Sequence, residues 1–213
     1  LNVIRKLKKS VVEEGVGNNY LIQHTTGSGK SLSIGWLSHL LSSLYQSSTD
    51  TKRMFDTIIV VTDRRVLDKQ IQNTIKQLEQ TKGVVCPVDL DSNQLKEFLE
   101  QGKSIIVTTV QKFPVISNSI SELKTKSFGV VIDEVHSSQS GETSRHLKKS
   151  LSKSILNTFN EGEDEDLTDV DKQILDEINN RGQQSHISYF GFSGTPKNKT
   201  LELFGRKQED GEF

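Results

Sequence analysis

Six short, largely apolar runs separated by helical patterns constrain the fold of this chain more than any other feature. They span residues 20–24, 57–62, 84–88, 104–109, 128–133 and 187–193. A regular alternation of strands and helices predicts a mainly parallel sheet with right-handed crossovers. Residues 128–132 are apolar throughout, as is typical of a strand buried on both faces by helices. The pattern therefore predicts a three-layer α/β fold.

Helical spacing of apolar residues locates the helices between these strands. One helix is predicted to open at Lys30, with an apolar side formed by Trp36, Leu37, Leu40, Leu41 and Leu44. A second spans residues 64–80 and places on one face Leu67, Ile71, Ile75 and Leu78. A third spans residues 93–101 and contains Leu95, Phe98 and Leu99. Residues 151–185 break the pattern with an acidic stretch at 161–166, so we expect an insertion there within a single domain at 1–213.

The segment His-Thr-Thr-Gly-Ser-Gly-Lys-Ser at residues 24–31 lies between the first strand and the first of these helices. Glycines allow successive backbone N–H groups to turn inward around an anion, and a helix N-terminus adds unpaired donors. Lys30 can place its ammonium on the β- and γ-phosphates of a nucleotide, and Ser31 can offer its hydroxyl to Mg²⁺. His24 occupies the position at which the pattern G-x-x-x-x-G-K-[ST] has its first glycine. The predicted nucleotide-binding residues are Thr26, Gly27, Ser28, Gly29, Lys30 and Ser31.

Two adjacent carboxylates follow the strand at residues 128–132, within the segment Val-Val-Ile-Asp-Glu-Val-His at 130–136. Open α/β sheets hold their ligands at the carboxyl ends of the strands, where these side chains lie. Adjacent residues of an extended chain point to opposite faces, so the two can have different roles. We expect Asp133 to hold Mg²⁺ with Ser31, directly or through water, and Glu134 to activate the attacking water. Together with Lys30 they are the predicted catalytic residues.

Composition limits the possible classes of protein. With 213 residues, one cysteine and no apolar run near the length of a membrane span, the chain is expected to be a cytoplasmic domain without a membrane segment. The formal net charge is only −1, so any binding to nucleic acid must be local. Two basic clusters, at residues 5–9 and 145–153, are interpreted first as solvated helix faces.

Together these segments resemble a known family. Gly-Ser-Gly-Lys-Ser and Asp-Glu-Val-His resemble motifs I and II of superfamily 2 helicases in their DEAH-like form. Residues 60–70 resemble motif Ia, residues 107–113 motif Ib, and residues 191–196 (Gly-Phe-Ser-Gly-Thr-Pro) motif III. With the segment His-Ser-Ser-Gln-Ser-Gly at 136–141, the combination is similar to the restriction (R) subunit of type I restriction–modification enzymes over about residues 20–205.

The resemblance implies a RecA-like P-loop NTPase fold and the first motor lobe of an ATP- and Mg²⁺-dependent translocase on double-stranded DNA. It implies a nuclease domain and a second RecA-like domain in the same polypeptide, with methyltransferase (M) and specificity (S) subunits as partners. It also implies that hydrolysis is coupled to movement by His136, Ser193 and Thr195. The residues expected to face the DNA backbone are Asp63, Arg64, Thr108, Thr109 and Gln111. The chain is then a fragment, and alone it is expected to be inactive because the second lobe supplies an arginine.

Three alternatives stay open at this point. The chain could belong to another superfamily 2 DExH helicase or translocase. A P-loop kinase or GTPase that does not act on nucleic acid is a second alternative, although the adjacent Asp133 and Glu134 speak against it. A non-catalytic docking domain is the third.

Overall fold

The computed structural model describes residues 2–25, 27–47, 49–62, 65–79, 81–89, 92–133, 184–194, 196, 200–201 and 204, without the side chains of 65–70 and 114. The insertion predicted at 151–185 therefore lies outside the described residues except for its last two positions. None of the described helices is long and apolar enough to cross a membrane.

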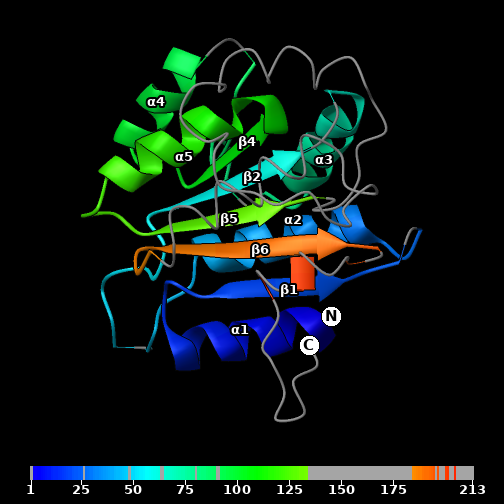
Figure 1. Cartoon of the computed structure of the whole chain (residues 1–213), viewed down its shortest axis with the longest axis horizontal. Helices are drawn as coiled ribbons and strands as arrows, with labels where there is room; N and C mark the ends of the chain where they lie inside the picture. Colours follow the sequence, from blue (N-terminus) through cyan, green and yellow to red (C-terminus); the bar gives the residue numbers. More distant parts are fainter. Residues whose placement is uncertain are drawn as a thin grey trace, which may run out of the picture.

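The described strands form one sheet of six parallel strands, in the order β1-β6-β5-β2-β4-β3 (Figure 1). Their bounds are β1 Asn19–Gln23, β2 Thr57–Thr62, β3 Val85–Pro87, β4 Ile105–Thr109, β5 Phe128–Ile132 and β6 Ile187–Ser193. The predicted parallel sheet is confirmed, and each strand begins and ends within one residue of its predicted bounds. Val and Ile dominate the central strands, where their branched side chains pack well on a pleated surface.

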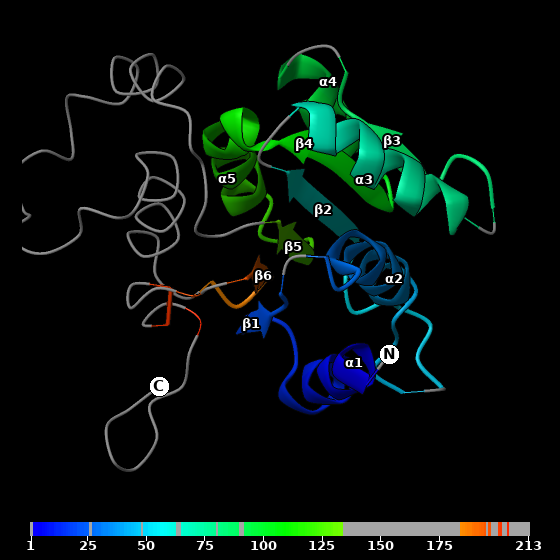
Figure 2. The ribbon, with the colours of Figure 1, turned by 90° about the vertical axis from the view of Figure 1, so that its right-hand side faces the viewer.

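Helices cover both faces of the sheet, and the view along the strands in Figure 2 separates the layers. One face is covered by α1 (Asn2–Glu14), α2 (Lys30–Ser42) and α3 (Arg65–Gln77). The other is covered by α4 (Ser92–Glu100), by α5 (Phe113–Glu122) and by the short 3₁₀ turn Val110–Lys112 that precedes it. The three-layer fold is the RecA-like architecture that the sequence predicted.

Alternation along the strands divides the core in two. In β2, Ile58 and Val60 pack toward α2, whereas Ile59 and Val61 pack toward α5. All four side chains are almost completely buried. Burying a side chain of this size stabilises a fold by about 1.5–3 kcal/mol, so β2 is held from both faces.

Some helical predictions need correction. Trp36 was expected on the apolar side of α2 but is 39% exposed, because the buried face is formed instead by Ile34, Leu37 and Leu41. Leu44 is buried, but it lies beyond the end of α2. Helix α1 was anticipated only through the basic cluster at residues 5–9, which was interpreted as a solvated helix face and whose basic side chains are exposed, and α5 was not predicted. In α1 the buried positions are separated by exposed basic residues, and α5 contains Pro114 in its first turn and several serines.

The turn between α1 and β1 is fastened to β6. The N–H groups of Gly17 and Asn18 both donate to the buried Ser188 hydroxyl, at 2.9 and 3.3 Å. Gly17 has a φ of 105°, and a Cβ atom at this position would lie 2.9 Å from the backbone of Ser185. Only glycine fits this close approach. The turn therefore sets how β1 meets β6.

We expect Gly17→Ala to lower the free energy of unfolding by about 2–4 kcal/mol, because the left-handed backbone and a contact with rigid backbone both oppose the new methyl group. Gly15→Ala is the matched control. Its φ is also positive, at 79°, but a Cβ atom there has open space, so we expect a loss of about 1 kcal/mol. Urea denaturation of both variants checks the prediction, and equal losses would contradict it.

Candidate active site

The predicted loop lies at the carboxyl edge of the sheet, between β1 and α2. Its glycines, Gly27 and Gly29, have φ values of 79° and 89°, which L-residues with side chains rarely adopt. Gly29 is the N-cap of α2 and has no side chain with which to satisfy the first N–H groups of the helix. A helix start of this kind suits an anion, because its N–H groups and dipole favour negative charge.

Lys30 and Asp133 meet at this edge. The Lys30 Nζ atom lies 3.1 Å from Asp133 Oδ1, although β1 and β5 are not neighbours in the sheet. The Asp133 N–H donates to the Val61 carbonyl at 2.9 Å, so its backbone is held at the end of β5. The two side chains are 14% and 4% exposed. The fold thus brings together two predicted catalytic residues that are distant in the sequence.

The oxygen ligands at this edge fit a magnesium ion. Asp133 Oδ1 is buried. Within the described part of the chain its polar contact is the Lys30 ammonium, and no other hydrogen-bond donor reaches it. Ser31 lies in the first turn of α2 and is half-buried. Carboxylate and hydroxyl oxygens are the hard ligands that Mg²⁺ prefers.

The side chain of His24 links the loop to the helix. Its Nδ1 atom lies 2.5 Å from Ser28 Oγ in the loop, and its Nε2 atom lies 3.1 Å from Ser33 Oγ in α2. Its backbone N–H donates to the Ser193 carbonyl in β6 at 2.8 Å. The sequence showed His24 only as a replacement for glycine. The sequence signal for these contacts was the pair of serines at positions 28 and 33, four and nine residues after His24.

Several other predicted residues can be placed. Ser193 is buried at the end of β6, between the strands that carry the loop and Asp133. Thr108 is 1% exposed inside β4, and its contact with DNA stays a prediction. Thr109 is half-buried and Gln111 is exposed, which leaves both available at the carboxyl edge. The predicted residues outside the described part of the chain are Thr26, Asp63, Arg64, Glu134, His136 and Thr195.

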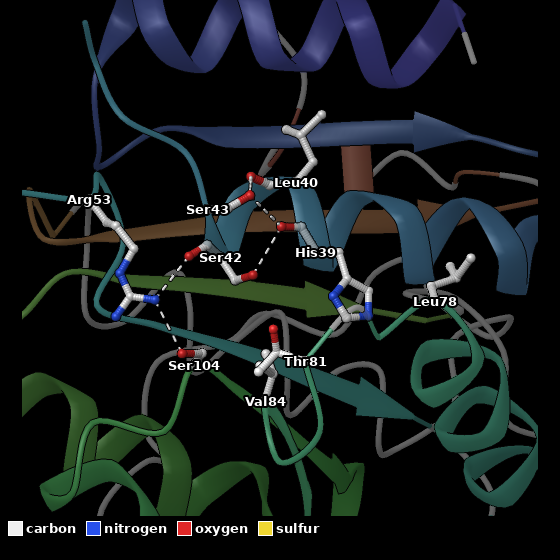
Figure 3. Close-up of a pocket in the computed structure, with 9 residues that line it drawn as sticks. All are labelled: His39, Leu40, Ser42, Ser43, Arg53, Leu78, Thr81, Val84 and Ser104. Atoms are coloured by element: carbon white, nitrogen blue, oxygen red, sulfur yellow. Dashed lines mark hydrogen bonds between the residues drawn. The ribbon is translucent and has the colours of Figure 1, made fainter. Parts of the chain in front are cut away.

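A cavity of about 490 Å³ lies at the opposite, amino edge of the sheet (Figure 3). Arg53 donates from Nη1 to the Ser42 carbonyl and to Ser104 Oγ, both at 3.1 Å. The His39 ring lies 2.8 Å from the Ile75 carbonyl, where α2 meets α3. These contacts satisfy the end of α2 and join neighbouring elements, so we interpret the polar lining of the cavity as structural.

Cys86 lies on the edge strand β3 and is a half-buried free thiol. Burial raises the pKa of this thiol, and Lys103 only partly opposes that shift. The thiol is therefore protonated at neutral pH and is not a candidate nucleophile.

Comparisons with known proteins give the family and the fold. The SWI2/SNF2 ATPase family matches residues 2–160. A type I restriction enzyme endonuclease subunit of Staphylococcus aureus is 27% identical over 203 residues, which cover 89% of this chain and 17% of that protein. The HindI endonuclease subunit, a type I restriction enzyme subunit of Haemophilus influenzae, is 29% identical over 209 residues, with coverages of 91% and 17%. The chain thus spans about a sixth of the length of these relatives.

Solved structures show the same fold at low sequence identity. The Hef helicase domain of Pyrococcus furiosus has a TM-score of 0.51 at 13% identity, with 95% of this chain and 36% of that chain covered. A nuclease-deletion mutant of the Type ISP restriction–modification enzyme LlaGI, solved with a DNA substrate mimic, has a TM-score of 0.54 at 12% identity, with 92% and 17% covered. The chain belongs to the SWI2/SNF2 ATPase family, and its resemblance to the R subunits of type I restriction enzymes is confirmed.

Proposed function

We propose that this chain is the first motor lobe of an ATP-dependent translocase on double-stranded DNA, within the R subunit of a type I restriction enzyme. The observation that carries the proposal is the contact between Lys30 and Asp133 beside a glycine-rich loop at the carboxyl edge. In a SWI2/SNF2 ATPase, these are the groups that an ATP-hydrolysing site requires. A nuclease domain elsewhere in the polypeptide would cut the DNA, and M and S subunits would complete the complex.

The ion pair suggests how the site accepts a nucleotide. Without phosphate, each of the two nearly buried charges neutralises the other. When ATP enters, Lys30 would turn to the β- and γ-phosphates, while the loop N–H groups surround them. Asp133 would then be free to hold Mg²⁺ together with Ser31. The ion pair would thus hold both groups in place until their ligands arrive.

Hydrolysis would depend on groups at the same edge. Bound Mg²⁺ would neutralise charge on the phosphate oxygens. Glu134 follows Asp133 directly and would orient and deprotonate the attacking water. Ser193, with His136 and Thr195, would transmit the state of the nucleotide to the DNA-bound surface. This assignment is supported by the position of Ser193 in β6, which pairs with both β1 and β5.

The proposed DNA contacts come from two neighbouring strands. Thr62 at the end of β2 is in register with Thr109 at the end of β4. In the sequence, Asp63 and Arg64 follow Thr62, and Gln111 lies two positions after Thr109. Contacts from Arg64 and Gln111 to phosphates would hold DNA regardless of its sequence, as a translocase requires.

ATP hydrolysis by the full-length protein in its complex, with and without double-stranded DNA, tests the function. We expect DNA to stimulate turnover, and Lys30→Ala and Glu134→Gln each to reduce it by about 100-fold or more. Lys9→Ala is the matched control, because Lys9 is exposed on α1, and it should retain turnover within about twofold. Turnover that ignores DNA, or that survives Lys30→Ala, would contradict the proposal.

The ion pair itself is open to a double-mutant cycle. Without nucleotide, we expect Lys30→Met to lower the free energy of unfolding by about 3–5 kcal/mol, because Asp133 would become an unpaired buried charge. Lys30→Met combined with Asp133→Asn should recover most of that loss. The exposed pair Lys9–Glu13, at 3.7 Å, is the control, and breaking it should cost about 1 kcal/mol or less. Urea denaturation gives the values, and strictly additive losses would show that Lys30 and Asp133 do not interact.

A further inference from the structure

His24 stands where the phosphate-loop pattern has a glycine, yet its side chain is fully engaged. The half-buried ring lies between two hydroxyls, Ser28 Oγ at 2.5 Å and Ser33 Oγ at 3.1 Å. Ser28 belongs to the exposed tip of the loop, and Ser33 to the first turn of α2. Glycine would keep the backbone bond from residue 24 to Ser193 but would lose both of these links.

The hydrogen-bond network favours one tautomer of the His24 ring. The Ser28 hydroxyl donates its single proton to the Thr25 carbonyl. Its oxygen can then only accept from His24, so the ring carries a proton on Nδ1. In the neutral imidazole, Nε2 is left as an acceptor for the Ser33 hydroxyl. Loop, ring and helix therefore form one connected chain of hydrogen bonds.

The two links differ in what they restrain. Ser33 lies in a helix that is already held by its buried residues Ile34, Leu37 and Leu41. Ser28 lies between two glycines with positive φ, in a loop with no buried side chain among its described residues. The bond to Ser28 is thus the one that reduces the conformational freedom of the loop. A loop that is already ordered loses less conformational entropy when it binds a ligand, so it binds more tightly.

We propose that His24 is a positioning residue, which holds Ser28 and the glycines beside it in the conformation that binds nucleotide phosphates. The inference deepens the proposed function and rests on its claim that this loop binds nucleotide. It assigns to His24 a role in nucleotide affinity and none in the chemical step, since the hydrogen bonds of the ring in the described part of the chain go to the loop and α2, and the ring lies near Phe192 of β6.

Variants of His24 in the full-length protein test the two links separately. In Asn the amide reaches about as far as Nδ1 of histidine, and in Gln about as far as Nε2, so Asn can keep the bond to Ser28 and Gln the bond to Ser33. We expect His24→Ala, His24→Gly and His24→Gln each to weaken binding of N-methylanthraniloyl-ADP by about tenfold. His24→Asn should remain within about threefold of the wild type. Ser33→Ala, which removes only the helix side, should also have an effect of about threefold or less.

Steady-state kinetics separate positioning from damage to the fold. Looser positioning of the loop should raise KM for ATP in His24→Ala while kcat stays within about twofold. Binding by His24→Ala as tight as in the wild type, or a loss confined to kcat, would overturn the inference. Equal losses in His24→Asn and His24→Ala would also overturn it, because the bond to Ser28 would then not matter. If the wild-type protein itself fails to bind the fluorescent nucleotide, the proposed function fails and the inference falls with it.

Discussion

The seating of β6 between β1 and β5 is the constraint on which the rest of the site depends. β1 carries the loop with Lys30, and β5 ends in Asp133, but the two strands do not pair with each other. β6 hydrogen-bonds to both and so sets the distance between them. Its start is held by Ser188, which accepts two backbone N–H groups from the turn before β1, and its end by the bond from His24 to Ser193. Among the described strands, β6 comes last in the sequence, yet it joins parts of the site that come much earlier.

A nearly buried ion pair, Lys30–Asp133, lies at this junction. Removing two charges from water is costly, and the cost is recovered only when they remain close together. Lys30 and Asp133 meet this condition at 3.1 Å, on elements that hydrophobic packing already holds in place. A phosphate group offers Lys30 stronger partners, and a divalent cation offers the same to Asp133. In the proposed function, Lys30 and Asp133 would exchange these partners for each other whenever the nucleotide leaves.

The strands and most of the candidate site could be predicted because each depends on local chemistry. Runs such as Thr57–Thr62 are branched and apolar on both faces, and glycines before a lysine need a particular backbone. Helix α1 was harder, since its three buried residues are separated by exposed basic ones, and two of them, Leu7 and Val11, become core only by packing with residues of other elements. Trp36 was misjudged for a related reason. Its type permits burial or exposure, and neighbours distant in the sequence decide between the two. The contacts of the His24 side chain also depend on the tertiary fold, so the phosphate-loop pattern, which expects glycine at this position, does not predict them.

Helix α2 is held at both ends, and this explains how a glycine-rich loop can still present a defined shape. At the amino edge, Arg53 donates to the Ser42 carbonyl in the last turn and fixes that end to the start of β4 through Ser104. At the carboxyl edge, His24 bonds to Ser33 in the first turn, while its own backbone is tied to β6. The loop from Thr25 to Gly29 therefore spans two fixed points. Glycine supplies the backbone angles that phosphate binding needs, but it also raises the entropy lost on ordering. A side chain that bonds into the loop from a fixed point offsets that loss, and a histidine in place of the first glycine is able to do so.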